Sequence, residues 1–283
     1  MRIDGKEIAA GIFENLKKRV EDLKKKGIIP HFAVILVGED PASKAYVRQK
    51  ELKTIEIGAK HTTFRLPETI SEEEVLSLVE KLNKDKTVHG IIVQRPLPSQ
   101  INPDKITKIS TPEKDIDSFH PDSFFPMPLA AAVLEILKNV YALIFKKTDE
   151  DFLNWLKSKK IIVIGKGATG GGPTAALLKK LGANPQVIDS KTKNPEELTK
   201  EADIVISAVG RPNIIKPEMI KKGVILITVG MSKGGDGKLH GDYNEEEIKD
   251  ITSFYTPVPG GVGPVNVAML LENLVSSAER LNK

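Results

Sequence analysis

The chain alternates between segments in which apolar residues recur every three or four positions and short, nearly continuous apolar runs. The first pattern is typical of amphipathic helices and the second of buried strands. In the first half, the pattern predicts helices over residues 4–26, 41–57 and 71–82, and strands over 31–38, 60–66 and 88–94. Strands that alternate with helices imply a parallel sheet with right-handed crossovers.

A proline-rich break, HPDSFFPMP at 120–128, separates this half from a second alternating half. The pattern of residues 129–158 predicts one or two helices, and a long helix is expected at the end of the chain. Strands are expected near 161–164, 186–189, 203–208 and 224–229. We therefore expect two α/β domains with a ligand-binding cleft between them. Their predicted bounds are 1–122, completed by the C-terminal helix at 265–283, and 123–264.

Composition narrows the function classes. The 283 residues are 40% apolar and 28% charged, as in ordinary globular proteins, and the net charge of +4 comes from runs of mixed sign. Aromatic residues make up only 5%, which argues against a nucleic-acid partner. The absence of cysteine excludes disulfides, thiolate zinc sites and a cysteine nucleophile. The five histidines show no metal-ligand spacing, so no metal is expected.

The N-terminus lacks an apolar secretory core, and no run approaches ~18 uninterrupted apolar residues. These features predict a cytoplasmic protein without a membrane partner.

The stretch IVIGKGATGGGP, residues 162–173, is typical of a strand that runs into a glycine-rich turn and then a helix. Gly165, Gly167 and Gly170 satisfy the G-x-G-x-x-G pattern of dinucleotide-binding turns, in which backbone amides approach a pyrophosphate. An acidic residue is expected about twenty positions further on, and Asp189 stands there. The alternative is a glycine-rich connection that binds no ligand.

Cofactor preference stays open at this point. A carboxylate at Asp189 accepts hydrogen bonds from a ribose 2′-hydroxyl and repels a 2′-phosphate, which favours NAD. Lys166 and Lys191 favour NADP, because either ammonium can pair with a phosphate.

Polar side chains in the first half supply candidate chemistry. Tyr46 and Lys50 are four residues apart and share one face of a predicted helix, and a phenol beside an ammonium can handle protons. Gln94 ends a predicted buried strand, and Asp115 and Asp117 follow a proline turn. Surface Tyr/Lys neighbours, a strand-end amide and a solvated acidic loop are the structural alternatives. Short-chain dehydrogenases also contain Y-x-x-x-K, but after the dinucleotide turn rather than before it.

Several stretches, in this order along the chain, resemble one family, the bifunctional methylenetetrahydrofolate dehydrogenase/cyclohydrolases. They are VGEDPASKAYVRQK, GIIVQRPLP, PEKDIDSFHP, the glycine-rich turn, ADIVISAVGRP and TPVPGGVGP. The resemblance covers essentially the whole chain. It implies an N-terminal parallel-sheet folate domain and a C-terminal Rossmann-like NAD(P) domain, in the bounds given above.

The family oxidises 5,10-methylenetetrahydrofolate with a nicotinamide cofactor and hydrolyses the methenyl product to 10-formyltetrahydrofolate. The resemblance implies that Lys50 handles protons in the hydrolysis and that Gln94 holds it in place. Tyr46 matches the tyrosine that packs on the folate ring, and Asp117 matches the aspartate that binds the pterin edge. The turn formed by Pro259, Gly260 and Gly261 is expected to contact substrate.

For the dinucleotide, the resemblance implies contacts that extend beyond the glycine turn. The expected set is Gly165, Lys166, Gly167, Thr169, Gly170, Asp189, Ser190 and Met231. The family default is NADP, whereas Asp189 suggests NAD. Family members are typically homodimers, so a second copy of the chain is the expected protein partner.

The sequence also departs from the family pattern. Lys166-Gly167 stands where an Arg-Ser pair is usual, and Asp189 stands where histidine is common. Other departures are Met127-Pro128-Leu129-Ala130, Ser118 in place of glycine, Val265-Asn266 and a longer segment over 139–158. Two alternatives therefore remain: a dehydrogenase without the hydrolase step, and a non-catalytic module that binds a dinucleotide.

Overall fold

The structure, a computed structural model, describes residues 1–146 and 151–282. Residues 147–150, which fall inside the predicted helical segment 129–158, and the last residue of the predicted C-terminal helix lie outside them. The chain divides into two compact units. The three-stranded unit comprises Gly11–Pro128 and Val267–Lys283, and the five-stranded unit comprises Met1–Ala10 and Leu129–Asn266. The cleft expected between two domains stays a prediction.

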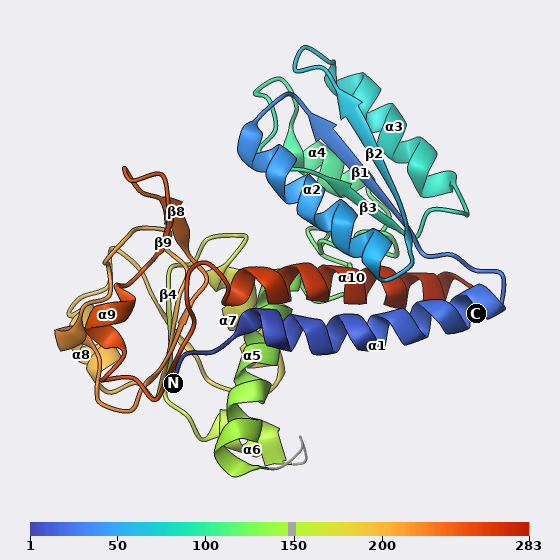
Figure 1. The fold of residues 1–283 in the computed structure, drawn as a ribbon. Helices are drawn as coiled ribbons and strands as arrows, with labels where there is room; N and C mark the ends of the chain where they lie inside the picture. The colour runs from blue at the N-terminus through green and yellow to red at the C-terminus, as the bar shows by residue number, and fades with distance from the viewer. Residues whose placement is uncertain (147–150, 283) are drawn as a thin grey trace. The chain divides into compact units, whose positions relative to one another are not determined.

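The three-stranded unit is built on a parallel sheet in the order β2-β1-β3. Its strands are β1 (His31–Val37), β2 (Lys60–Leu66) and β3 (Gly90–Val93), and its helices include α2 (Pro41–Glu56), α3 (Glu72–Lys84) and α4 (Pro103–Ile109). All seven residues of β1 are buried. On one face of β1, Ala33, Ile35 and Val37 belong to the same apolar cluster as Val75 and Val79 of α3. Figure 1 shows these helices beside the sheet.

Two of these helices begin at the positions that the sequence predicts, and each has an N-terminal cap. At α3, the Ser71 hydroxyl accepts from the Glu74 amide while the Glu74 carboxylate accepts from the Ser71 amide, which is a complete capping box. At α2, the Asp40 carboxylate accepts from the Ser43 amide at 2.7 Å, and Pro41 occupies the first turn. Both caps satisfy amides that would otherwise lack a partner.

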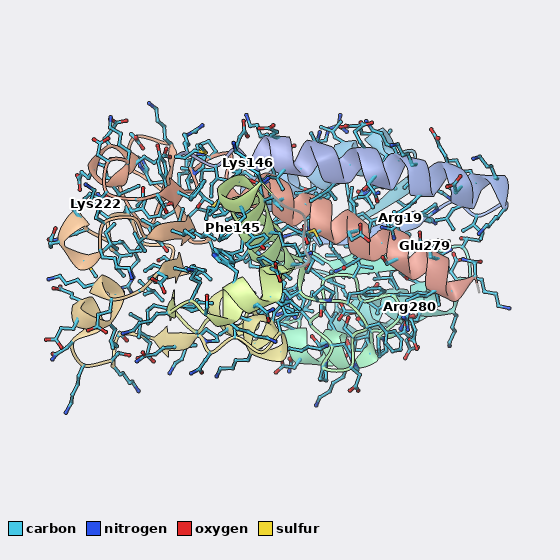
Figure 2. The ribbon with its side chains drawn as sticks, turned by 90° about the horizontal axis from the view of Figure 1, so that it is seen from below. Arg19, Phe145, Lys146, Lys222, Glu279 and Arg280 are labelled. Carbon is cyan, nitrogen blue, oxygen red and sulfur yellow. The ribbon has the colours of Figure 1, made fainter. Side chains whose placement is uncertain are left out.

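Two long helices near the ends of the chain, α1 (Gly5–Lys25) and α10 (Val262–Leu281), complete the three-stranded unit. The first residues of each helix, up to Ala10 in α1 and up to Asn266 in α10, belong to the five-stranded unit. The Arg19 guanidinium of α1 pairs with Glu272 at 2.5 Å and Glu279 at 2.8 Å of α10, and Figure 2 shows Arg19 and Glu279 turned toward one another. The Asn273 amide donates to the carbonyls of Ile116 and Pro126, both at 2.9 Å. The C-terminal helix is therefore part of this unit's framework.

The five-stranded unit carries a parallel sheet in the order β10-β7-β6-β4-β5. Its strands are β4 (Ile161–Ile164), β5 (Gln186–Ile188), β6 (Ile204–Ser207), β7 (Ile225–Thr228) and β10 (Phe254–Tyr255). The first four confirm the predicted strands. Its other elements are α5 (Pro128–Phe145), α6 (Phe152–Lys157), α7 (Gly171–Lys180), α8 (Pro195–Lys200), η2 (Pro217–Met219), α9 (Glu245–Ile248) and an antiparallel hairpin of β8 (Met231–Lys233) and β9 (Leu239–Gly241).

Helix α5 is the one helix, among the described residues, that is long and apolar enough to cross a membrane, with a mean hydropathy of 1.6. Half of it is buried in the structure, and its two charged residues, Glu135 and Lys138, pair at 2.7 Å. An aromatic contact between Tyr141 and Trp155, with ring centroids 5.5 Å apart, joins it to α6. We interpret α5 as a core helix of the five-stranded unit.

Candidate active site and dinucleotide site

Lys50 and Gln94 meet in the three-stranded unit, although 44 residues separate them along the chain. Lys50 lies on α2, and Gln94 is the first residue after β3. The Gln94 backbone amide donates to the Ile35 carbonyl at 2.9 Å and so continues the pairing with β1. The Lys50 Nζ donates to the Gln94 Oε1 at 3.0 Å, while the Gln94 Nε2 donates to the Arg95 carbonyl at 2.7 Å. Because both ends of the amide are bonded, its oxygen is held toward the ammonium.

The surroundings of Lys50 favour its neutral form. Burial lowers the pKa of the Lys50 amine below its usual value of 10.5, and the negative charge of Asp117 opposes this shift. An amine with a lowered pKa can accept and release a proton closer to neutral pH. The geometry therefore equips Lys50 for proton transfer.

Tyr46 lies one helical turn before Lys50 on α2, with 43% of its surface exposed. Partial burial raises the pKa of its phenol above the usual 10. The phenol therefore stays protonated near neutral pH and offers an exposed aromatic face. The i, i+4 spacing on one helical face, expected from the sequence, is present.

Asp117 lies in a loop that Asp115 organises. The buried Asp115 carboxylate accepts from the backbone amides of Ser118 at 3.1 Å and His120 at 2.6 Å. Burial raises the pKa of Asp115, and the charge of Asp117 adds to this, while the His120 amide opposes it. Ser118 has φ = 61°, in the left-handed region that favours glycine. Its hydroxyl donates to the Phe125 carbonyl at 2.7 Å, which helps to hold this conformation.

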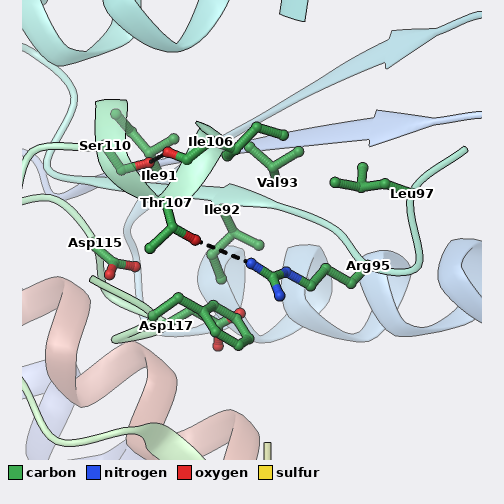
Figure 3. A pocket seen from close by; sticks show the side chains of 11 residues that line it. Ile91, Ile92, Val93, Arg95, Leu97, Ile106, Thr107, Ser110, Asp115 and Asp117 are labelled. Atoms are coloured by element: carbon green, nitrogen blue, oxygen red, sulfur yellow. Dashed lines mark hydrogen bonds between the residues drawn. The ribbon is translucent and has the colours of Figure 1, made fainter. Parts of the chain in front are cut away.

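Asp115 and Asp117 both line a pocket beside β3, shown in Figure 3. In the lining of the same pocket, the Arg95 guanidinium lies 4.0 Å from the centre of the Phe119 ring and donates to the Thr107 hydroxyl at 3.2 Å. A stacked, hydrogen-bonded guanidinium is a fixed positive group. Sequence reasoning missed Arg95, although it directly follows Gln94 and stands in the same signature.

In the five-stranded unit, the glycine turn between β4 and α7 needs its glycines for close packing. Gly165 has φ = +93°, and a Cβ there would lie 2.8 Å from the Ala208 carbonyl oxygen. A Cβ on Gly171 would lie 1.9 Å from the Gly165 oxygen. Gly170 occupies the N-cap of α7, and no side chain among the described residues caps that helix. The turn therefore combines a tight bend with a helix N-terminus, the arrangement that receives a pyrophosphate.

The turn is open where a ligand would approach. Apart from its own chain neighbours, no described residue has an atom within 4 Å of the position of a Cβ on Gly167, and Thr169 is exposed. These features fit the phosphate groups of a dinucleotide. No three His, Asp or Glu side chains in the described part of the chain are placed to hold a metal ion.

Asp189 and Lys166, which give opposite indications of cofactor preference in the sequence, form an ion pair. The Lys166 Nζ lies 2.6 Å from the Asp189 Oδ2, and the Lys191 amide donates to the Asp189 Oδ1 at 2.9 Å. The lysine and the amide lower the pKa of this carboxyl. The neighbouring Ser190 is exposed. Asp189 is thus fixed at the end of β5, while the largely exposed ammonium of Lys166 remains beside it.

The remaining predicted residues also lie in the five-stranded unit. Met231 opens β8 and is 40% exposed. In the PGG turn, the Gly5 amide donates to the Gly260 carbonyl at 2.9 Å, and a Cβ on Gly261 would lie 2.5 Å from the Pro257 oxygen. The preceding bond, Val258–Pro259, is cis. Close backbone contacts therefore hold the turn against the start of α1.

The sheet order, the glycine turn and the paired lysine and glutamine define a two-unit α/β protein with a Rossmann-like dinucleotide-binding unit. Two family models match the chain: the catalytic domain of tetrahydrofolate dehydrogenase/cyclohydrolase over residues 3–117, and its NAD(P)-binding domain over residues 140–282. The chain belongs to the tetrahydrofolate dehydrogenase/cyclohydrolase family, which confirms the predicted family and fold class.

Individual relatives match along the whole chain. The bifunctional protein FolD of Lactococcus lactis subsp. lactis is 43% identical, over 98% of this chain and 97% of the relative. The crystal structure of the bifunctional FolD methylenetetrahydrofolate dehydrogenase/cyclohydrolase from Campylobacter jejuni is 39% identical and covers 99% of both chains, with a TM-score of 0.91. The Trypanosoma brucei enzyme, solved with NADP and an inhibitor, is 30% identical, with a TM-score of 0.87 and coverage of 99% and 97%.

Proposed function

We propose that this protein oxidises 5,10-methylenetetrahydrofolate with NAD(P)+ and hydrolyses the resulting 5,10-methenyltetrahydrofolate to 10-formyltetrahydrofolate. The hydrogen bond from Lys50 to Gln94 carries this proposal, because it pairs an amine of lowered pKa with a group that orients it. A dehydrogenase without the hydrolase step would not need this pair. A dinucleotide-binding module without catalysis would need neither the pair nor Asp117.

The oxidation needs alignment more than acid or base. The lone pair of a substrate nitrogen expels hydride directly and leaves a delocalised cation, so no side chain has to remove a proton. Asp117 binds the pterin edge, where a carboxylate offers two acceptors to two donors. The exposed ring of Tyr46 packs on the folate's aromatic ring, and the turn at Pro259–Gly261 contributes to substrate binding.

The hydrolysis requires water to add to the methenyl cation and protons to move. Lys50 accepts and returns a proton at Nζ, a role that its lowered pKa supports. Gln94 keeps Nζ in place through its amide oxygen. Arg95, which lines the same pocket as Asp117, adds a positive group to the proposed pterin site.

The dinucleotide is held by the glycine turn and the ends of the neighbouring strands. Gly165, Gly167, Thr169 and Gly170 receive the pyrophosphate. At the adenosine end, Asp189 accepts from a ribose 2′-hydroxyl, and Lys166 meets a 2′-phosphate when NADP is used. Ser190 and Met231 complete the contacts. The bound nicotinamide supplies the hydride acceptor.

The assembly and location follow the family. The chain acts as a homodimer in the cytoplasm, with a folate and a nicotinamide dinucleotide as its small-molecule partners.

The decisive experiment measures two initial rates on the purified protein. Methylenetetrahydrofolate oxidation is followed with NAD and with NADP at matched concentrations, and methenyltetrahydrofolate hydrolysis is followed without dinucleotide. Both activities are expected. Oxidation without hydrolysis would contradict the proposal and indicate a dehydrogenase that lacks the hydrolase step. Dinucleotide binding without oxidation or hydrolysis would indicate a non-catalytic binding module.

A further inference from the structure

Asp242, directly after β9, is a fully buried carboxylate in the five-stranded unit. Its Oδ2 accepts from the Ser207 hydroxyl at 2.5 Å and the Val209 amide at 3.0 Å. Its Oδ1 accepts from the amides of Gly210 at 2.9 Å and Arg211 at 3.0 Å. A buried carboxylate is costly unless donors surround it, and here the last residue of β6 and the loop that follows it supply all four donors. Asp242 therefore determines the path of residues 207–211.

That loop leaves β6 at the side of the sheet where ligands bind. The strand order reverses between β4 and β6, and open α/β sheets bind ligands outside the carboxyl ends of strands at such a reversal. The loop also contacts the glycine turn. A Cβ on Gly165 would lie 2.8 Å from the Ala208 oxygen, and one on Gly170 would lie 3.2 Å from the Ala208 Cβ. A shift of the loop would therefore displace the turn.

The backbone of Asp242 also holds the end of β7. The Asp242 amide donates to the Thr228 hydroxyl at 3.1 Å. A Cβ on Gly230 would lie 2.3 Å from the Gly210 amide nitrogen and 2.4 Å from the Asp242 Oδ2. No side chain fits between the two loops at this point. Asp242 thus fastens together the segments that follow two adjacent strands, on the edge that carries the glycine turn.

We propose that Asp242 is a positioning residue for the dinucleotide: by holding residues 207–211 against the glycine turn, it sets the shape of the dinucleotide site without touching the ligand. This rests on the proposed function. It goes beyond that function because Asp242 belongs to none of the expected cofactor contacts. The steps that use the dinucleotide should respond most, since in the described part of the chain the carboxylate bonds only to residues 207–211, and Lys50 and Gln94 belong to the three-stranded unit.

The test is Asp242→Asn, which replaces one acceptor oxygen by an NH₂ group that faces donors. We expect the Kd of NAD and of NADP, measured by calorimetry, and the KM of the preferred one to rise about tenfold, as the loss of one to two hydrogen bonds implies. Hydrolysis of methenyltetrahydrofolate should stay within about twofold of the wild type. The control is Asp236→Asn, in the exposed β8–β9 turn, where the carboxylate pairs with His240 at 2.9 Å.

A second, milder variant tests the same contact if Asp242→Asn does not fold. Ser207→Ala removes one donor and leaves the three amides, so its dinucleotide KM should rise less than that of Asp242→Asn. Unchanged dinucleotide affinity in both folded variants, or a parallel fall of oxidation and hydrolysis, would overturn the proposal. Failure of the proposed function looks different, because the wild type itself would then lack one or both rates.

Discussion

The Lys50 Nζ lies 3.0 Å from the Gln94 Oε1, and this contact joins the last turns of α2 to the end of β3. Further hydrogen bonds hold both residues in place. The Thr54 hydroxyl donates to the Lys50 carbonyl at 2.7 Å, and the Gln94 side-chain Nε2 donates to the Arg95 carbonyl. The position of the amine is therefore set by two secondary-structure elements rather than by a mobile loop.

Replacing Lys50 by methionine tests its role in hydrolysis. Lys50→Met keeps an unbranched side chain but removes the proton acceptor, so hydrolysis should fall by about 10²- to 10⁴-fold. The affinity for NAD and NADP should be unchanged, because the glycine turn belongs to the other unit. Lys53→Met, on the same helix, removes a lysine that pairs with Glu56 and should leave hydrolysis intact. Unchanged hydrolysis in Lys50→Met would contradict the assignment.

Replacing Gln94 by glutamate tests how the amine is tuned. A carboxylate beside Lys50 stabilises its charged form, so the pKa of Lys50 should rise toward or above its usual value. The base is then neutral only at higher pH, and the pH–rate profile of hydrolysis should move to higher pH by about one unit or more. Gln49→Glu adds the same charge at an exposed position of α2 and serves as control. An equal displacement in the two variants would argue against a direct contact.

Cofactor choice depends on the pair formed by Asp189 and Lys166. Asp189→Asn removes the charge that repels a 2′-phosphate and frees Lys166 from its ion pair, so kcat/KM with NADP should rise relative to NAD by about tenfold. Lys166→Ala should lower the use of NADP and affect NAD less. The measurement is the ratio of kcat/KM values for the two cofactors. A ratio that neither variant changes would place the 2′ contact on other residues.

The buried His89 predicts a loss of stability in acid. Burial lowers its pKa from 6.5 to about 4, and the charges of Lys114 and His31 add to this. The unfolded chain therefore takes up a proton between about pH 6.5 and pH 4 that the folded chain does not. Stability is fully present above this range and is lost as pH falls through it, by roughly 3 kcal/mol at most.

The check is urea unfolding of His89→Asn and of the wild type between pH 7.5 and 4.5. In the wild type, the His31 amide donates a hydrogen bond to the His89 Nδ1 at 3.2 Å, and asparagine retains an acceptor for it. The variant should lose part of the decline of unfolding free energy in acid; the rest comes from other groups such as His61, whose pKa burial also lowers to about 4. His240→Asn, at an exposed site of the hairpin, should follow the wild type. Parallel curves for all three proteins would refute the prediction.

Features that depend on neighbours in the chain followed from the sequence alone. The capping box at Ser71, the strand–turn–helix around Gly165 and the shared helical face of Tyr46 and Lys50 all arise within a few residues, where periodicity and backbone preference act. The motifs also sufficed to predict the family. Short elements escaped: β10 has two residues, and each strand of the hairpin has three, too few to show a period.

Only the tertiary structure decided which distant groups meet. The family resemblance implied that Gln94 holds Lys50, but the spacing of residues placed the two only on a helix and a strand. Their contact depends on how α2 packs on the sheet. Lys166 and Asp189 looked like competing signals and turn out to be paired, because β4 and β5 are neighbours. Asp242 follows a hairpin without a recognisable motif, yet it organises the loop after β6. Such contacts are set by the three-dimensional packing of strands and helices, which local spacing does not encode.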